Sequence, residues 1–158
     1  MAFMRNERGF TLAELIVAIA ILGILATIIS PRLDTPLSEA ILNARAFEIA
    51  QDIRRVQQLA VTSGESHRFE IHAANRIYRI RPQDPFKSSI KTVNLDIQIT
   101  RVTSNFQDIG GGWTRLDYIP TGIPSQTGEV VIFDNRGRGR AIIIAVGTGR
   151  VRIEVRTR

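Results

Sequence analysis

Residues 8–29 read RGFTLAELIVAIAILGILATII, and this apolar run organises the rest of the chain. From Phe10 to Ile29 there are twenty residues, and Glu14 is the only charged one among them. A helix of twenty residues rises about 30 Å, which matches the hydrocarbon core of a bilayer. Arg5 and Arg8 precede the run and favour a cytoplasmic position for that end. The sequence therefore predicts a transmembrane helix over residues 10–30 with a cytoplasmic N-terminus.

A secretory signal peptide is the first alternative for this segment. Such signals also have a basic start and an apolar core, and Ala18-Ile19-Ala20 has the small-x-small pattern of a cleavage site. However, that pattern falls in the middle of the run, which is longer than the apolar core of most secretory signals. A secretory signal also leaves Glu14 unexplained, because an isolated carboxylate is costly in lipid. The run therefore favours a membrane anchor in which Glu14 has a function.

The Gly9-Phe10 junction, Glu14 and the apolar run together resemble the class III signal of type IV pilins and pseudopilins. In these families a prepilin peptidase cuts after the glycine on the cytoplasmic face and methylates the new N-terminal phenylalanine. The resemblance implies a leader peptide of residues 1–9, cleavage between Gly9 and Phe10, and N-methylation of Phe10. Glu14 then becomes the fifth residue of the mature chain and Pro31 the twenty-second, and both positions fit the family pattern.

The resemblance also implies a role for Glu14 in assembly. Cleavage creates a new amine at Phe10, and in a fibre this amine could approach Glu14 of a neighbouring subunit and set its axial register. An opposite charge reduces the cost of burying a carboxylate. The alternative is that Glu14 reaches the lipid headgroups without any partner, since it is only four residues from the mature end.

Two prolines follow the apolar run. Pro31 removes a helical hydrogen bond, so we expect a kink there, and Pro36 predicts a second bend. Residues 31–64 are predicted to continue the helix in amphipathic form until Gly64 ends it. Their apolar positions are spaced by three and four residues, which indicates one helix face packed on a sheet. These positions are Leu42, Ala46, Ile49, Ile53, Val56 and Ala60.

In the head, residues 65–158, apolar and polar residues alternate with a period of two, which is typical of strands. We expect strands at 67–73, 78–81, 93–99, 129–134, 140–146 and 150–156. Residues 103–128 fit no strand or helix and predict a long loop. Its Trp113 is either an exposed recognition residue or a plug over the sheet, and we favour the plug because large aromatics are mostly buried. The fold class is therefore α+β, with one long N-terminal helix packed on an antiparallel sheet.

Signatures of enzymes and metal sites are scarce. The chain has no cysteine, which excludes disulfides, zinc fingers and cysteine nucleophiles. His67 and His72 are five residues apart on a predicted strand, so they face opposite sides and cannot share a metal. Gly110-Gly111-Gly112 lacks the lysine and the strand-to-helix setting of a phosphate loop. We therefore expect no catalytic activity, no cofactor and no metal.

The net charge of +6 is unevenly distributed. Residues 10–129 carry twelve basic and twelve acidic side chains, whereas residues 130–158 carry seven arginines against Asp134 and Glu154, a balance of +5. If 150–156 is a strand, Val151, Ile153 and Val155 face the core and the arginines line the other face. The arginines fit either a polyanion or acidic partner, or an edge strand whose charges prevent aggregation.

Three features together resemble the GspH/FimT family of minor pilins and pseudopilins: the anchor, the helix from Ala44-Arg45 to Ala60, and the closing Phe133-Asp134 with Gly149-Arg150-Val151-Arg152. The family includes pseudopilin H of type II secretion and the FimU and FimT minor pilins. The resemblance implies a type IV pilin-like fold with a long kinked N-terminal helix. In some FimT proteins a Gly-Arg-x-Arg motif binds DNA, which would make Arg150 and Arg152 phosphate contacts. Arg138 and Arg140 repeat the same pattern and are the second candidate pair.

The resemblance implies a minor pilin or pseudopilin in the tip or priming complex of a type II secretion pseudopilus or type IV pilus. It would cross the bacterial inner membrane once and place its head in the periplasm. Its partners would be other pilins or pseudopilins of the same fibre, the prepilin peptidase and the inner membrane. The alternative function is binding of double-stranded DNA for uptake in natural transformation.

Overall fold

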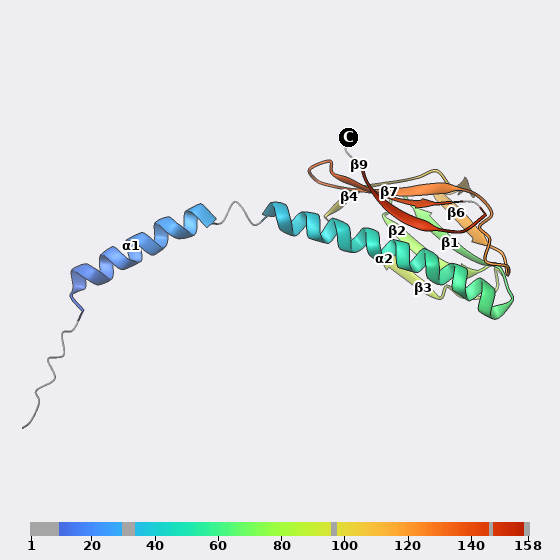
Figure 1. Ribbon diagram of the computed structural model, residues 1–158, viewed down its shortest axis with the longest axis horizontal. Coiled ribbons are helices and arrows are strands. Elements are labelled where there is room, and N and C mark those ends of the chain that lie inside the picture. The colour runs from blue at the N-terminus through green and yellow to red at the C-terminus, as the bar shows by residue number, and fades with distance from the viewer. Residues whose placement is uncertain (1–9, 30–33, 96–97, 146, 157–158) are drawn as a thin grey trace, which may run out of the picture. The chain divides into compact units, whose positions relative to one another are not determined.

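The computed structural model describes residues 10–29, 34–95, 98–145 and 147–156 (Figure 1). The chain divides into two compact units, Met1–Leu37 and Ser38–Arg158. The first unit holds helix α1 and the start of α2. The second unit holds the rest of α2 and strands β1 to β9.

Helix α1 runs from Leu12 to Ile29 and begins with a capping box. The Thr11 hydroxyl accepts a hydrogen bond from the Glu14 N–H at 3.2 Å, and the Glu14 carboxylate accepts one from the Thr11 N–H at 3.1 Å. Such reciprocal bonds satisfy N–H groups that a helix leaves unpaired at its start. The sequence predicted that a transmembrane helix covers residues 10–30. Within the described ranges, no helix is long and apolar enough to cross a membrane.

Helix α2 runs from Asp34 to Ser63, and Pro36 lies in its first turn. The helix runs through Pro36 without a break, because first-turn N–H groups have no intrahelical acceptor to lose. The predicted kink at Pro31 lies outside the described residues. The six apolar positions predicted to face a sheet are all fully buried, which confirms that part of the prediction. They are Leu42, Ala46, Ile49, Ile53, Val56 and Ala60.

Two antiparallel sheets follow α2 in the described part of the chain. One has the strand order β3-β2-β1-β6-β5, and the other has the order β4-β7-β8-β9. The strands are β1 His67–His72, β2 Ile77–Pro82, β3 Lys91–Asn94, β4 Ile99–Ser104, β5 Gln107–Asp108, β6 Trp113–Tyr118, β7 Gly128–Asp134, β8 Gly139–Ile144 and β9 Val151–Arg156.

One hydrophobic core joins α2 to both sheets. The five-stranded sheet contributes Phe69 and Tyr78, whose stacked rings have centroids 5.2 Å apart, and the four-stranded sheet contributes Ile132 and Ile142. All members of this core lie between residues 42 and 151, within the second unit. We therefore expect Ser38–Arg158 to fold without the first unit.

A buried polar cluster also links α2 to the five-stranded sheet. The Asp52 carboxylate on α2 accepts hydrogen bonds from the Tyr78 hydroxyl and from Lys91 Nζ, both at 2.6 Å. Burial raises the pKa of the Tyr78 hydroxyl, and Asp52 raises it further, so the hydroxyl stays protonated and donates. Lys91 lies on the edge strand β3, which the cluster therefore fixes to the helix.

The segment from Val93 to Ile99 is not one strand, contrary to the sequence prediction. Val93 lies in β3 of the five-stranded sheet, whereas Ile99 begins β4 of the four-stranded sheet. Leu95 and Ile99 are nevertheless both buried in the shared core. The alternation of apolar and polar residues in the sequence therefore predicted which residues are buried. It did not predict that the chain passes from one sheet to the other between them.

The prediction that residues 103–128 form a loop is also wrong. Strand β6 pairs with β1 inside the five-stranded sheet, and its inward residues Leu116 and Tyr118 are fully buried. Trp113 starts this strand and lies half-buried on the face away from α2, with its ring 5.2 Å from that of His72. The Arg79 guanidinium covers the Trp113 ring at 4.1 Å. Trp113 thus packs on the sheet, as the plug interpretation predicted, but it remains partly exposed.

Candidate functional site

The predicted processing and assembly residues lie at the start of α1. Gly9 lies outside the described residues, and Phe10 is exposed just before the helix. Glu14 is also exposed, and its carboxylate accepts hydrogen bonds from the Thr11 hydroxyl and N–H, both at 3.1 Å. In this state the Glu14 carboxylate therefore stabilises the first turn of its own helix. The pattern Thr11-x-x-Glu14 in the sequence signals this cap.

Arg138, one of the candidate DNA contacts, is tied to two other elements. Its guanidinium pairs with Asp134 at 2.7 Å across the β7–β8 turn. It also donates to the Ser38 hydroxyl and lies 3.5 Å from Glu39 on α2. The side chain is thus engaged in joining the β7–β8 hairpin to the helix.

Arg140, the second residue of this pair, is more deeply buried. Its side chain is only 8% exposed, and it donates to Asn43 Oδ1 at 2.6 Å and to Glu39 Oε1 at 3.0 Å. A DNA phosphate cannot reach this guanidinium without displacing Asn43 and Glu39. Gly137-Arg138-Gly139-Arg140 therefore forms a structural junction with α2, despite having the same pattern as the C-terminal motif.

Asp134 is the centre of this junction. Its Oδ1 atom accepts hydrogen bonds from the N–H groups of Arg136 and Arg138, both at 2.9 Å. Burial alone would raise the pKa of Asp134. The hydrogen bonds from Arg138 and Arg136 and the charge of Arg138 outweigh that effect and lower the pKa below its ordinary value. Asp134 is therefore ionised at neutral pH and holds the hairpin turn.

Arg150 and Arg152, the other candidate pair, are exposed at the start of β9. The Arg152 side chain is 69% exposed and lies 3.2 Å from Glu154. Together with Thr127 and Thr148, both arginines line a hollow of about 680 Å³ beside the β8–β9 turn. This pair, unlike Arg138 and Arg140, is accessible to an anionic partner.

The apolar side of β9 departs from the sequence prediction. Val151 is buried as expected, but Ile153 is 39% exposed and Val155 is 68% exposed. The sequence predicted that all three face the core. This is wrong for Ile153 and Val155. They lie on the edge strand of the sheet, where the side chains of the core no longer cover them.

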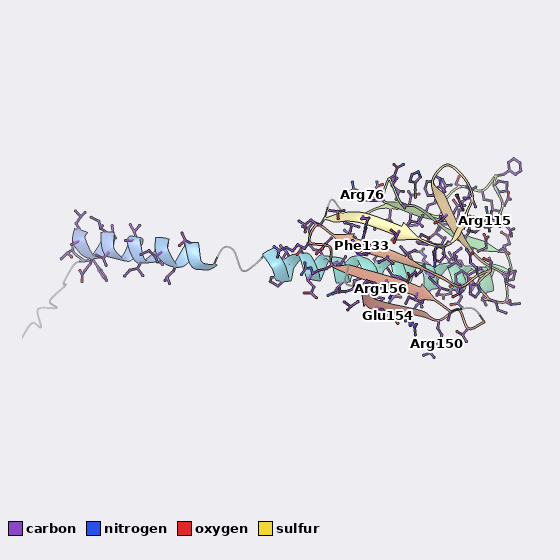
Figure 2. The ribbon with its side chains drawn as sticks, turned by 90° about the horizontal axis from the view of Figure 1, so that it is seen from above. Arg76, Arg115, Phe133, Arg150, Glu154 and Arg156 are labelled. Carbon is purple, nitrogen blue, oxygen red and sulfur yellow. The ribbon has the colours of Figure 1, made fainter. Side chains whose placement is uncertain are left out.

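Further arginines lie on the face of the four-stranded sheet opposite Ile132 and Ile142, and Figure 2 labels Arg156 and Phe133 on this sheet. The Arg101 guanidinium covers the Phe133 ring at 4.0 Å, and Arg156 pairs with Glu129 at 2.9 Å. A Cβ on Gly139 would lie 2.8 Å from the Phe133 ring, so only glycine lets that ring lie across the sheet. Sequence reasoning missed the contribution of Arg101, because the pairing of β4 with β7 is not visible in the sequence.

The glycine of the Gly149-Arg150-Val151-Arg152 motif has a structural explanation. Gly149 has a φ of +63°, and a Cβ there would lie 2.5 Å from Gln57 Nε2. The same Gln57 amide donates to the Gly122 carbonyl at 2.8 Å. Gln57 on α2 therefore packs against the loops that contain Gly122 and Gly149. The conformation and close packing of Gly149 explain the glycine of the motif whether or not DNA binds.

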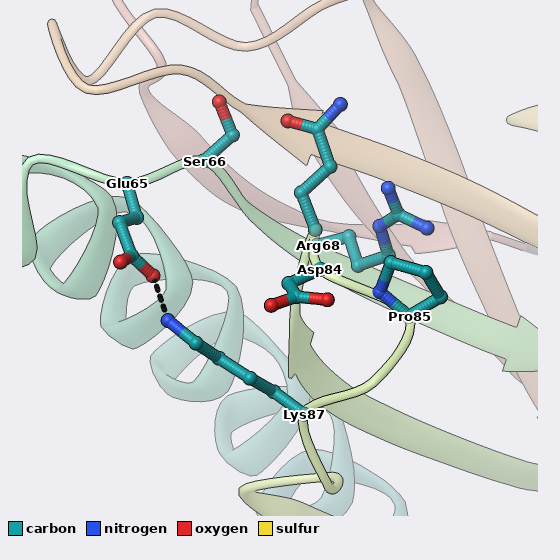
Figure 3. Close-up of a pocket in the computed structure, with 7 residues that line it drawn as sticks. Glu65, Ser66, Arg68, Asp84, Pro85 and Lys87 are labelled. Carbon is teal, nitrogen blue, oxygen red and sulfur yellow. Dashed lines mark hydrogen bonds and ion pairs between the residues drawn. The ribbon is translucent and has the colours of Figure 1, made fainter.

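A second hollow, of about 670 Å³, lies where α2 ends beside the connection from β2 to β3 (Figure 3). Glu65 and Lys87 face each other across it, with Nζ 2.6 Å from the carboxylate. Arg68 also lines it and lies 3.3 Å from Asp117. Both ion pairs bring opposite charges together at this hollow.

The N-terminal motif and the fold each match known proteins. The family described as the prokaryotic N-terminal methylation motif matches residues 4–30. No curated protein matches the sequence. The chain is similar to the minor pseudopilin EpsH from the type 2 secretion system of Vibrio cholerae, with a TM-score of 0.58, 14% identity, and coverage of 72% of this chain and 96% of that chain. It is also similar to the type IV minor pilin FimU of Pseudomonas aeruginosa, with a TM-score of 0.56, 14% identity, and coverage of 72% and 87%.

The chain thus has an α+β type IV pilin-like fold and carries the prokaryotic N-terminal methylation motif at residues 4–30. The predicted fold and the predicted N-terminal methylation motif are in this respect confirmed.

Proposed function

We propose that this protein is a minor pilin or pseudopilin, a structural subunit of the tip or priming complex of a type II secretion pseudopilus or a type IV pilus. The observation that carries the proposal is the N-terminal motif, in which Gly9-Phe10 and Glu14 precede a long apolar segment. Its head has the fold of two proteins whose names describe a minor pseudopilin and a minor pilin. The protein is then a building block and not an enzyme.

The proposal includes a route from membrane to fibre. Residues 10–30 anchor the precursor in the bacterial inner membrane, with the leader in the cytoplasm and the head in the periplasm. A prepilin peptidase removes residues 1–9 and methylates Phe10. The mature chain then leaves the bilayer and joins other pilins or pseudopilins of the same fibre.

Processing by a prepilin peptidase tests the proposal directly. Co-expression of the full chain with such a peptidase is expected to give a product that has lost residues 1–9 and gained one methyl group on Phe10. Intact-mass spectrometry measures both changes. Gly9→Val is the matched control and should remain uncut, because the peptidase cuts after glycine. A chain that stays full-length, or that is cut within Ala18-Ile19-Ala20, would contradict the proposal.

DNA binding is the second candidate function, and the exposure of Arg150 and Arg152 favours it. Arginine forks bind phosphate with two hydrogen bonds, and flanking glycines let the backbone approach closely. Arg152 has Glu154 beside it, which weakens its attraction for phosphate. The candidate surface is therefore the exposed pair Arg150 and Arg152.

Binding of duplex DNA to Ser38–Arg158 at two salt concentrations tests this candidate. If the pair contacts phosphates, affinity is expected to fall by about tenfold or more from low to physiological salt, because phosphate contacts release counterions. Arg150→Gln/Arg152→Gln should abolish that binding, whereas a second surface elsewhere would leave it intact. Absence of binding at low salt would leave the arginines as contacts to other subunits. Fluorescence anisotropy gives the affinities.

A further inference from the structure

Strand β9 has an open edge in the described structure, since it pairs with β8 on one side and with no strand on the other. Ala145 donates to the Arg150 carbonyl at 3.1 Å, so the backbone groups of Arg150 face β8. Alternation along an antiparallel strand then turns the N–H and C=O groups of Val151, Ile153 and Val155 toward the open edge. A further strand could bond to these groups.

One end of this edge is already closed by α2. The Arg54 guanidinium donates to the Val151 carbonyl at 3.0 Å, which uses the first edge-facing acceptor. The same bond shows that the Val151 carbonyl points toward the open edge, as the alternation of backbone groups along the strand requires. The part that remains for a partner begins at Ile153 and includes Val155.

An apolar strip runs beside this edge. Phe47 on α2 is 56% exposed, and it lies on the same helix face as Asn43 and Arg54, because the spacings of four and seven residues return to one side. Asn43 bonds Arg140, whose partner in the strand register is Val155, and Arg54 bonds Val151. Phe47 therefore lies along the interval between them, on the side of β9 where Ile153 and Val155 are exposed.

The other side of the edge is basic. Arg150, Arg152 and Arg156 belong to the β9 segment, and Glu154 is the only acidic residue between them. On the α2 side, Arg54 adds a positive charge where the helix meets Val151. A strand paired with β9 would therefore have its outward side chains next to arginines and its inward side chains next to Ile153, Val155 and Phe47.

We propose that the β9 edge receives an extended segment of another fibre subunit, in which acidic side chains alternate with apolar ones. Backbone hydrogen bonds to the edge supply affinity, and the alternation of side chains supplies specificity. A second copy of β9 fits less well, because two such segments bring together six arginines and only two glutamates. The inference rests on the proposed function, since that function supplies the partner subunits.

The test uses a fluorescein-labelled synthetic peptide in which glutamate alternates with valine, titrated with the full chain in detergent micelles. Binding is expected, and a peptide with lysine at every glutamate should bind about tenfold more weakly or worse, because its charges oppose the arginines. Ile153→Pro should weaken binding of the acidic peptide by about tenfold, since it removes an edge-facing N–H while the bonds to β8 remain.

Val155→Glu is the second variant, because its exposed position leaves folding undisturbed. It places a negative charge beside the peptide and should also weaken binding. Thr103→Glu is the matched control, as it adds the same charge at an exposed position on β4, the opposite edge of the same sheet. Equal binding of the two peptides, equal effects of Val155→Glu and Thr103→Glu, or dimerisation of the chain without peptide would each overturn the inference.

The proposed function and this inference fail in different ways. If the precursor is not cut after Gly9, the proposed function fails whatever the peptide does. If processing is normal and the acidic peptide does not bind, only the edge assignment fails. The remaining possibility is that this surface binds DNA. Binding of duplex DNA by Ile153→Pro tests it, because phosphate contacts through Arg150 and Arg152 do not need the backbone N–H of residue 153.

Discussion

Glu14→Ala is expected to reduce the amount of protein incorporated into fibres by about tenfold or more, while cleavage after Gly9 and membrane insertion continue. The expectation follows from the proposed pairing of Glu14 with the new amine of Phe10 on a neighbouring subunit. Without the carboxylate, that amine would be buried in the fibre without a partner, which costs several kcal/mol. Immunoblots of sheared fibres against membrane fractions measure incorporation and retained precursor in the same cells.

The capping box at the start of α1 makes a second interpretation of that result possible. Glu14→Ala removes both the negative charge and the acceptor for the Thr11 N–H. Glu14→Gln separates the two effects, since glutamine also serves in a capping box but has no charge. Thr11→Ala does the reverse, because it removes the hydroxyl that accepts from the Glu14 N–H and keeps the carboxylate.

If the charge sets the register, Glu14→Gln should lose incorporation as severely as Glu14→Ala, and Thr11→Ala should retain most of it. If helix capping is responsible, Thr11→Ala should resemble Glu14→Ala and Glu14→Gln should behave as wild type. Normal incorporation of Glu14→Ala would contradict both explanations and leave Glu14 near the lipid headgroups without a partner.

The elements that depend on local pattern were predictable from the sequence. Apolar residues spaced by three and four indicated the buried face of α2. Alternation with a period of two indicated five strands at the expected residues, namely β1, β2, β7, β8 and β9. Periodicity succeeds at these places because each element buries one face in the shared core. It failed at β6, where a preceding triple glycine and nearby prolines obscured the alternation from Trp113 to Tyr118.

The candidate site was less predictable because it depends on contacts between distant residues. Two identical Gly-Arg-x-Arg patterns have different environments: Arg140 is buried against α2, whereas Arg150 is exposed. About one hundred residues separate Arg140 from Glu39, and no local pattern reports such a pairing. Likewise, the alternation in β9 predicted which residues share a face. It could not show that the core ends before Val155.

Asp134→Asn is expected to lower the free energy of unfolding of Ser38–Arg158 by about 3 kcal/mol near neutral pH, because it breaks a buried ion pair and leaves Arg138 without its main counter-charge. The Asp134 side chain is 1% exposed and pairs with Arg138 at 2.7 Å. Chemical denaturation measures the loss. Asp84→Asn is the matched control: Asp84 is exposed and accepts one backbone hydrogen bond, from Phe86 at 2.9 Å, so its replacement should change stability by less than about 0.5 kcal/mol.

The pH dependence of the free energy of unfolding distinguishes the effect of the Asp134 charge from the effect of its hydrogen-bonding pattern. Its pKa is lowered in the folded chain relative to the ordinary value of 3.8, so folding favours the ionised form. This contribution is fully present above the unfolded pKa and is lost as the pH falls through the lower folded pKa. The stability gap between wild type and Asp134→Asn should therefore be widest near neutral pH and should narrow below about pH 4. A gap that stays constant down to strongly acidic pH would mean that asparagine disturbs the turn by its hydrogen-bonding pattern and not by its missing charge.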